Sequence, residues 1–571
     1  MVRGTRKRLA RAVCIGVLLV AAVAALPISS ASAAPQAFGT GKPPTGSGIN
    51  TPAAYANPLC DKDAGPYGRM DFVLKGFGVV CFPEWKKGTN NGGATYQGVT
   101  KDSIKVDILV PNDQQLKGAR PGQLPVNHAT GGNGTVTNAF KDTFAAFQPA
   151  HNTYGRTFDL HFVTSSGDDE ASQRADAVTV KGDKPFAVID GTYTSEPVFA
   201  TELAAAKIPV LQNTTSLEST LKQAPYRWGQ TDVNAGAINA AEFVGKQLVG
   251  KKAVYAGDDA MHSQTRKFGL VYADPVTYVP EFNKAAAKYG VKFAPGASIS
   301  YAAIDDPFGD PAAAAQQAPT IIAKFKSLGV TSILLLADSG MVGALTKAAT
   351  SNDYHPEWII GAFNYSDLGF FARQYDQDQW DHAFGISNLP PPIVSSAPAN
   401  PALDAVQWYF GQGKGTSSTL HGNLVDKFTQ MITYAGPNLT PKTLQQGMFS
   451  VPAYGGAAEN SKYMVQQGFG RTDGLPYDEY LAGNKDFTAA WWDSTTMGPA
   501  LPSVGLPAGQ GTLYYVNGAQ RYYGSHWPTK PMKFFDKSVA IYKFDTPDTV
   551  PPAVPCTGCP STGGSGPQPA T

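Results

Sequence analysis

The chain has 571 residues, of which 42% are hydrophobic and 16% are charged, and its formal net charge is +1. This balance is typical of a globular protein and excludes a largely disordered chain. The length exceeds that of one ordinary hydrophobic core, so the sequence predicts about two to four structural units.

The first 33 residues have the pattern of a signal peptide. Five basic residues and no acidic one occur in "MVRGTRKRLAR", the apolar run "AVCIGVLLVAAVAALP" follows, and "ASA" at 31–33 offers small residues for cleavage. The pattern predicts an exported chain that begins at Ala34, resides in the periplasm or cell envelope or outside the cell, and has no stable membrane insertion. An uncleaved signal anchor is the alternative.

The charge of the predicted mature chain argues against a nucleic-acid partner. Without the five basic residues of the signal segment, 41 basic residues stand against 45 acidic ones, a net charge of −4. Nucleic-acid-binding proteins instead carry a basic patch or stripe.

The cysteines predict disulfides. Cys14 lies inside the apolar run and not at the cleavage point, so no lipid anchor is predicted. The other four cysteines form an even set in an exported chain, which favours disulfides over metal or redox sites. Three pairings are open, and the most local joins Cys60 to Cys81 and Cys556 to Cys559. A four-cysteine zinc site and a redox "PCTGCP" motif are the less favoured alternatives.

Apolar strands alternate with amphipathic helices over more than 250 residues. Such alternation predicts parallel sheets covered by helices on both faces, and so many strands favour two doubly wound α/β lobes. The predicted strands are 103–111, 158–163, 185–190, 208–212, 267–274, 291–296, 330–338 and 357–363. One predicted helix contains Val136, Phe140, Phe144 and Phe147. The other predicted helices span 170–180, 197–206, 235–250, 279–290, 319–329 (with Pro319 at its start) and 341–350.

The domain organisation follows from this pattern. The segments rich in Gly, Pro, Ser and Thr at the two ends of the mature chain predict a flexible extension and a flexible tail. The predicted parts are a signal peptide (1–33), an N-terminal extension with Cys60 and Cys81 (34–96), the first part of an N-lobe (97–230), the first part of a C-lobe (231–378), return segments that complete both lobes plus an aromatic-rich addition (379–545), and a tail with Cys556 and Cys559 (546–571).

Polar residues gather where predicted strands end. Ligands of open α/β sheets bind beyond the carboxyl ends of the strands, where hydroxyls and helix N-termini can hold a carboxylate or another small polar group. Alternatively, Ser195 and Thr215 only cap their helices, and the tyrosines only pack in the core. The candidate ligand-binding residues are Thr192, Thr194, Ser195, Thr214, Thr215, Tyr278, Asp338, Ser339, Asn364 and Tyr365.

Four stretches carry a resemblance to a known family. They are "GVTKDSIKVDILVP", "FAVIDGTYTSEPVFATELAAAKIPVLQNTTS", "APYRWGQTDVNAGAINAAEFV" and "AGPNLTPKTLQQGMF". Over about residues 97–450 the chain resembles the type I periplasmic binding proteins, in particular the branched-chain amino acid group of ABC-transporter substrate-binding proteins. Long versions with a "CxGCP" tail look actinobacterial. The resemblance implies two lobes that are joined by three crossing segments and close on a ligand.

The resemblance also implies roles for some residues. Thr194, Ser195, Thr214 and Thr215 would hold a ligand's carboxylate and amine, and Tyr278 matches a tyrosine of the C-lobe. The acid that neutralises the ligand's amino group has its place in "GAFNYSD", where Asn364 and Tyr365 stand, so Asp338 or Asp367 would have to substitute. This departure argues against an α-amino-acid ligand.

The sequence predicts a binding protein and not an enzyme. It has no G-x-S-x-G, H-E-x-x-H, G-x-G-x-x-G or G-x-x-x-x-G-K-[ST] motif, so no cofactor or metal is predicted. The predicted function is capture of a small polar organic molecule, amino-acid-like or related, between two lobes for ABC-type import, with an ABC permease as partner. The alternatives are an extracytoplasmic ligand sensor and a structural or partner-binding surface protein that reuses the fold.

Overall fold

A computed structural model describes fourteen stretches of the chain. These are residues 46–71, 79–118, 132–192, 198–231, 233–274, 279–302, 310–363, 365–392, 401–410, 419–462, 464–470, 480–483, 485–500 and 506–544. The predicted signal peptide and the tail with Cys556 and Cys559 lie outside them. Within the described stretches, no helix is both long enough and apolar enough to cross a membrane.

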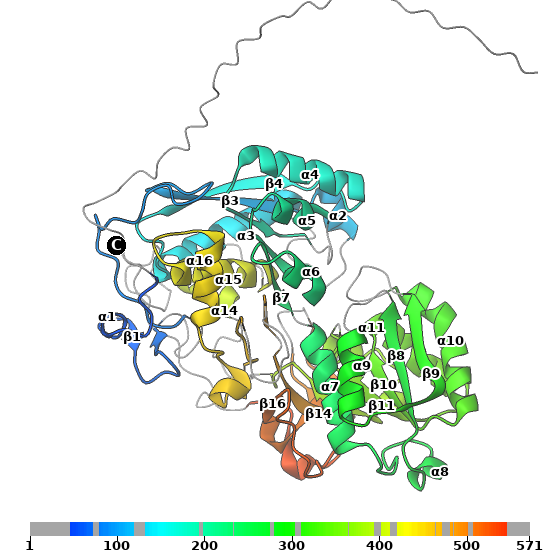
Figure 1. The fold of residues 1–571 in the computed structure, drawn as a ribbon. Coiled ribbons are helices and arrows are strands. Elements are labelled where there is room, and N and C mark those ends of the chain that lie inside the picture. The colour runs from blue at the N-terminus through cyan, green and yellow to red at the C-terminus, as the bar shows by residue number, and fades with distance from the viewer. Residues whose placement is uncertain are drawn as a thin grey trace, which may run out of the picture. The chain divides into compact units, whose positions relative to one another are not determined.

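The first sheet has six strands, all parallel, in the order β13-β7-β6-β5-β3-β4 (Figure 1). Its first five strands in the chain thus follow the spatial order 2-1-3-4-5 of a doubly wound fold. The pairing of β3 with β4 runs from Ser103 opposite Thr157 to Val110 opposite Thr164. The strands are β3 (Ser103–Val110), β4 (Thr157–Thr164), β5 (Ala187–Asp190), β6 (Val210–Thr214), β7 (Arg227–Thr231) and β13 (Leu481–Gly483).

Helices cover both faces of the first sheet. Ile104, Val106 and Ile108 of β3 pack on one face with helices from distant parts of the chain, whereas Leu109 packs on the other with α4 and α5. Burial of side chains on both faces explains why Ile108, Leu109 and Val110 are consecutive apolar residues at the end of this strand. The helices of this lobe are α2 (Asp113–Gly118), α3 (Gly132–Phe147), α4 (Glu170–Asp183), α5 (Val198–Ala205), α6 (Leu217–Lys222), α14 (Pro401–Phe410), α15 (Thr419–Ala435) and α16 (Pro441–Ser450).

The second sheet has nine strands in the order β17-β15-β14-β12-β11-β10-β8-β9, with β16 also paired to β14. Strands β8 to β12 are parallel and repeat the order 2-1-3-4-5, and the later strands join antiparallel. The strands are β8 (Phe268–Asp274), β9 (Phe293–Ala302), β10 (Ser332–Leu336), β11 (Glu357–Gly361), β12 (Ala383–Ser387), β14 (Asp486–Gly498), β15 (Gly509–Val516), β16 (Arg521–Tyr523) and β17 (Ala540–Ile541).

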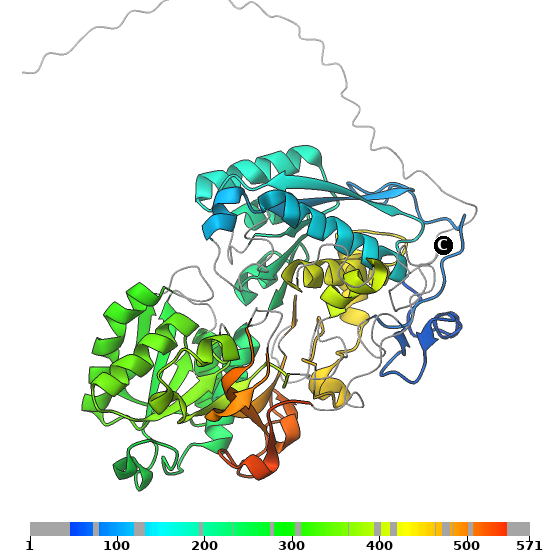
Figure 2. The same ribbon diagram turned by 180° about the vertical axis from the view of Figure 1, so that it is seen from behind.

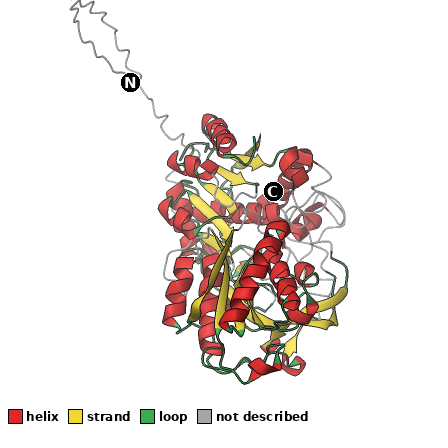
Figure 3. Ribbon diagram, turned by 90° about the vertical axis from the view of Figure 1, so that its right-hand side faces the viewer, coloured by secondary structure: helices red, strands yellow, loops and turns green. Residues whose placement is uncertain are grey.

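Helices again lie on both sides of these strands (Figure 3). They are α7 (Val233–Gln247), α8 (Asp259–His262), α9 (Val279–Lys288), α10 (Pro311–Leu328), α11 (Ser339–Ser351), α12 (Gly369–Ala372) and α13 (Gln377–Trp380). The predicted α/β class with two doubly wound parallel sheets is therefore confirmed. The chain passes from the first sheet to the second after β7, back after β12 and over again after β13.

One predicted helix start is wrong. Pro319 lies inside α10, which begins at Pro311. The Asp310 side chain caps the helix by accepting hydrogen bonds from Ala312 N (2.8 Å) and Ala313 N (3.3 Å), and the alanines that follow favour the helical state. These two effects outweigh the loss of one backbone hydrogen bond at the internal proline.

The aromatic-rich region after residue 450 belongs mainly to the core of the second lobe. Trp491 and Trp492 of β14 and Tyr514 of β15 are buried, and the rings of Trp491 and Tyr514 stack at 4.7 Å. Trp527 is also buried and donates its indole N–H to Asn239 Oδ1 (2.7 Å). Figure 2 shows these late strands, in orange and red, beside the green strands of the same sheet.

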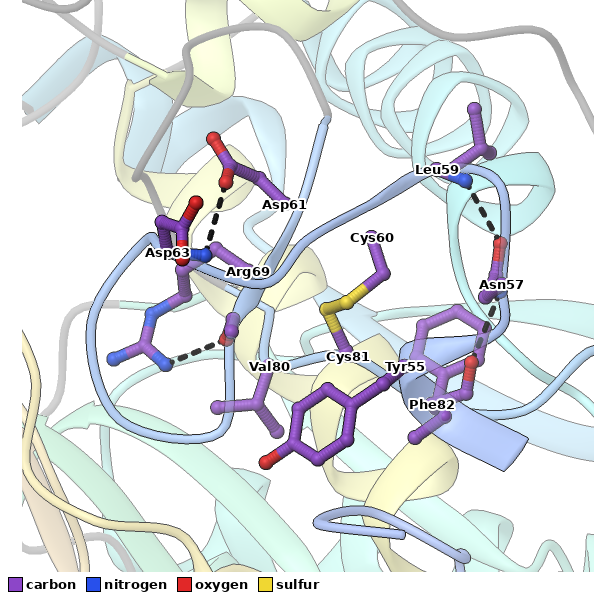
Figure 4. Close-up of a disulfide and its surroundings, with 12 residues drawn as sticks. Tyr55, Asn57, Leu59, Cys60, Asp61, Asp63, Arg69, Val80, Cys81 and Phe82 are labelled. Carbon is purple, nitrogen blue, oxygen red and sulfur yellow. Dashed lines mark hydrogen bonds between the residues drawn. A yellow bond between two sulfur atoms is a disulfide. The ribbon is translucent and has the colours of Figure 1, made fainter. Parts of the chain in front are cut away.

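The N-terminal extension carries the predicted disulfide between Cys60 and Cys81 (Figure 4). Two short strands, β1 (Cys60–Asp61) and β2 (Arg69–Met70), pair beside it, and α1 (Pro52–Tyr55) precedes them. The extension is fastened to the first lobe because Val80 N donates to the Tyr434 hydroxyl of α15 at 2.9 Å.

Candidate functional site

Each sheet has a switch point at which its strand order reverses. In the order 2-1-3-4-5 it lies between the first and third strands, which are β3 and β5 in one lobe and β8 and β10 in the other. Ligands of doubly wound folds bind beyond the carboxyl ends of the strands at such points. Thr192 follows β5, and Asp338 and Ser339 follow β10, so the structure brings three predicted residues to the two switch points.

Asp190, the last residue of β5, organises the switch point of the first sheet. Its Oδ1 accepts hydrogen bonds from Thr192 N (2.9 Å) and Thr192 Oγ1 (2.6 Å), and its Oδ2 accepts one from Gln212 Nε2 (3.3 Å). Burial raises the pKa of Asp190 to about 6, although these donors and nearby Arg227 act to lower it. The Thr192 hydroxyl proton is thus used inside the protein, and its oxygen can still accept a hydrogen bond.

A chain of polar side chains continues from Asp190 across the sheet. Gln212 Oε1 accepts from Arg227 Nε (2.9 Å), and Arg227 Nη1 also donates to Gln223 Oε1 (3.2 Å). Gln212 and Arg227 are buried. The sequence analysis missed both residues. The signal that could have found them is an arginine at the start of a strand inside the sheet, where a buried cation requires partners.

The predicted threonines of β6 lie at the next strand end. Thr214 is the last residue of the strand and pairs with Thr231 of β7, and Thr215 follows it and is buried. The cap of α6 is Ser216, whose hydroxyl accepts from Ser219 N (3.1 Å), so the alternative in which Thr215 caps the helix is wrong.

Asp338 and Ser339 form the start of α11 in the second lobe. The Asp338 side chain caps the helix by accepting a hydrogen bond from Met341 N (2.9 Å). It also accepts a hydrogen bond from the Tyr301 hydroxyl, and the oxygen of that hydroxyl accepts one from the backbone N–H of Asp338 (2.9 Å). Burial raises the pKa of Asp338. Both carboxylate oxygens therefore have internal donors, and Ser339 is buried in the first turn. Asp338 therefore positions this loop, with one internal donor on each carboxylate oxygen.

Asp367, after β11, differs from the other two acids. It is 1% exposed, and its Oδ2 accepts the Ser387 hydroxyl from the end of β12. No hydrogen-bond donor reaches its Oδ1 in the part of the chain that the structure describes. Burial raises the pKa of Asp367 to about 6, and Ser387 acts against that rise. An ionised carboxylate with one unused oxygen would be costly here unless a donor arrives.

Asp367 lines a cavity of about 200 Å³ in the second lobe. Arg373 also lines it, but its guanidinium already donates to the carbonyls of Gly511 (2.9 Å), Pro507 (2.8 Å) and Pro499 (3.2 Å). Most of the remaining wall is apolar or backbone, and Asp367 is the only acidic residue among the described lining residues. The other lining residues are Leu368, Gly369, Leu389, Pro390, Pro391, Pro392, Pro499, Gly511, Thr512, Leu513 and Tyr515.

The remaining predicted residues divide into two groups. Tyr365 is described, is 42% exposed, and has a backbone φ of 58°, in the left-handed region that few tyrosines adopt. Thr194, Ser195, Tyr278 and Asn364 lie outside the described residues, and so does the side chain of Thr214.

Solved structures with a similar arrangement exist, at low identity. A fatty acid ABC transporter substrate-binding protein from Thermomonospora curvata is 13% identical, with a TM-score of 0.46 over 76% of this chain and 96% of that one. A putative branched-chain amino acid ABC transporter from Rhodospirillum rubrum is 14% identical, with a TM-score of 0.43 over 68% and 97%. A solute-binding protein from R. palustris in complex with 4-hydroxybenzoate is 14% identical, with a TM-score of 0.41 over 67% and 97%. No protein-family model and no curated protein sequence matches this chain.

Proposed function

We propose that this chain is an exported solute-binding protein that captures a small polar organic molecule, amino-acid-like or related, for ABC-type import. The observation that carries the proposal is Asp367, a buried carboxylate with one oxygen that lacks a donor among the described residues, at a cavity with mainly apolar walls. A protein that binds by desolvating its ligand needs this combination of an apolar enclosure and a few unsatisfied polar groups.

The chemistry of the cavity restricts the ligand. The ligand has to offer Asp367 Oδ1 a hydrogen-bond donor, such as an ammonium, a hydroxyl or an amide. The rest of the ligand has to fit against Leu368, Leu389 and Tyr515. A hydrogen bond to a charged acceptor contributes about 1.5–3 kcal/mol. Asp367 thereby takes the place of the acid that the resemblance leads one to expect nearby.

The strand ends of the first sheet would hold the other end of the ligand. The Thr192 oxygen remains an acceptor. Ser195, three residues later in the chain, and Thr215, which follows the neighbouring strand β6, would supply further hydroxyl groups. We expect Ser195→Ala and Thr215→Ala each to weaken binding by about 0.5–3 kcal/mol without unfolding the protein. Unchanged affinity in both variants would remove these hydroxyls from the site.

The first experiment is native mass spectrometry of the mature chain from Ala34, purified from an exporting host, followed by thermal shifts against a library of small metabolites. A bound molecule, or a shift with one chemical class of donor-bearing compounds, supports the proposal. Neither a bound molecule nor a shift would favour a structural or partner-binding role instead.

A further inference from the structure

A cluster of ionisable side chains lies away from the carboxyl ends of the strands, on the α4 side of the first sheet. Asp107 stands in the middle of β3, directly opposite His161 of the neighbouring edge strand β4, and Asp183 is the last residue of α4. One ligand atom from each of these three residues lies within 4.8 Å of the other two.

Asp107 is the unusual member of this cluster. Its side chain is fully buried, and neither of its carboxylate oxygens has a hydrogen-bond partner among the described residues. A carboxylate buried in the middle of a strand costs free energy unless a cation or a donor compensates it. His161 and Asp183 lie on the side of the sheet from which such a compensating group can arrive.

The neighbours of Asp107 are arranged around a shared point. The two carboxylate oxygens of Asp183 have different partners. Oδ1 pairs with Lys105 Nζ at 2.5 Å, and Oδ2 lies 3.1 Å from His161 Nδ1. The other ring nitrogen of His161, Nε2, lies 3.4 Å from Asp159 Oδ1. A carboxylate on one imidazole nitrogen fixes the tautomer and leaves the other nitrogen free to bind a metal ion.

We propose that Asp107, His161 and Asp183 bind one divalent cation of the zinc type. One imidazole nitrogen and two carboxylate oxygens suit Zn²⁺, with a water molecule in the fourth position. His161 is 41% exposed and Asp183 31% exposed, so the ion can enter from solvent while Asp107 supplies a buried ligand. The ion would join β3, β4 and α4 and would neutralise the charge buried in β3.

The test is a calorimetric titration of the full mature chain with Zn²⁺ after free thiols are alkylated, so that Cys556 and Cys559 do not contribute. We expect one ion per chain, and a loss of affinity of at least about tenfold in Asp107→Asn and in His161→Gln. The amide introduced by Asp107→Asn can still donate to Asp183, so this variant should fold, which circular dichroism checks.

His262→Gln is the matched control. His262 is 40% exposed and lies 3.5 Å from Asp259, a similar pair that lacks a buried carboxylate, and its replacement should leave Zn²⁺ binding unchanged. Equal affinity in the wild type, Asp107→Asn and His161→Gln, or no Zn²⁺ binding to the wild type, would overturn the proposal.

Discussion

The two sheets share one strand order, but the acidic residues at their strand ends differ in how many of their carboxylate oxygens accept hydrogen bonds. In the first sheet, Asp190 accepts hydrogen bonds on both carboxylate oxygens, and in the second sheet Asp338 does the same. Asp367, one strand further along the second sheet, keeps one oxygen without a donor among the described residues. Burial raises the pKa of Asp190 and of Asp367 to about 6 in each case.

The comparison teaches that burial and a shifted pKa do not by themselves mark a binding residue. Asp190 and Asp338 have the shift, yet their oxygens are committed to loops and helix starts that they position. Only the count of donors separates Asp367 from them. Polar groups with complete partners should therefore affect stability, and the group with an incomplete set should affect ligand binding.

The largest expected effect concerns a carboxylate with a complete set of partners. Glu357 is buried and accepts from Arg266 Nε (2.7 Å) and Nη2 (2.8 Å), and also from Ser332 Oγ (2.6 Å). Glu357→Ala should lower the free energy of unfolding by about 3–5 kcal/mol, because it leaves the Arg266 charge buried and unpaired. Urea denaturation measures this. The exposed pair of Glu170 with Arg174 (2.8 Å) is the control, and Glu170→Ala should cost less than about 1 kcal/mol.

A smaller effect is expected at the first sheet's strand end. Asp190→Ala removes the acceptor of the Thr192 hydroxyl and of Gln212 Nε2 and should destabilise the chain by about 2–3 kcal/mol. An equal loss in Asp367→Ala would contradict the distinction between the two acids, since Ser387 is the internal donor that the described residues give Asp367.

The smallest expected effect is a pH dependence. The folded-state pKa of Asp367, about 6, lies above its ordinary value of 3.8, so the folded chain binds this proton more tightly than the unfolded chain. The stability that this protonated group contributes is complete below about pH 4 and is lost as the pH rises through about 6. Between pH 4.5 and pH 7.5 the wild type should lose about 1–2 kcal/mol more of its free energy of unfolding than Asp367→Asn does, as urea denaturation at the two pH values measures. An identical pH dependence in the two proteins would show that Asp367 titrates normally.

The alternation of strands and helices could be predicted because hydrophobic period and capping residues are local signals. Asp190 and Asp338 lie where the predicted strands end, for the same reason. The difference between the acids could not be predicted, because the donors depend on strand neighbours. Ser387 reaches Asp367 across 20 positions of the chain, and Arg227 reaches Gln212 across 15.

The cluster around Asp107 could not be predicted either, because it depends on the register between strands β3 and β4. Nothing in the sequence places His161 opposite Asp107, which stands in the strand two residues after another charged residue, Lys105. The helix start misplaced at Pro319 has a local cause, since a capping aspartate and a run of alanines precede it.

The most direct test of the central claim is the affinity of the ligand identified by mass spectrometry for wild type, Asp367→Asn and Asp176→Asn, measured by calorimetry. Asp176 is a buried carboxylate of α4 whose oxygens accept from Ser166, which makes it a matched control outside the proposed site. The account predicts at least about tenfold weaker binding in Asp367→Asn, equal to about 1.4 kcal/mol, and wild-type affinity in Asp176→Asn. Wild-type affinity in Asp367→Asn would contradict the assignment of its open oxygen to the ligand.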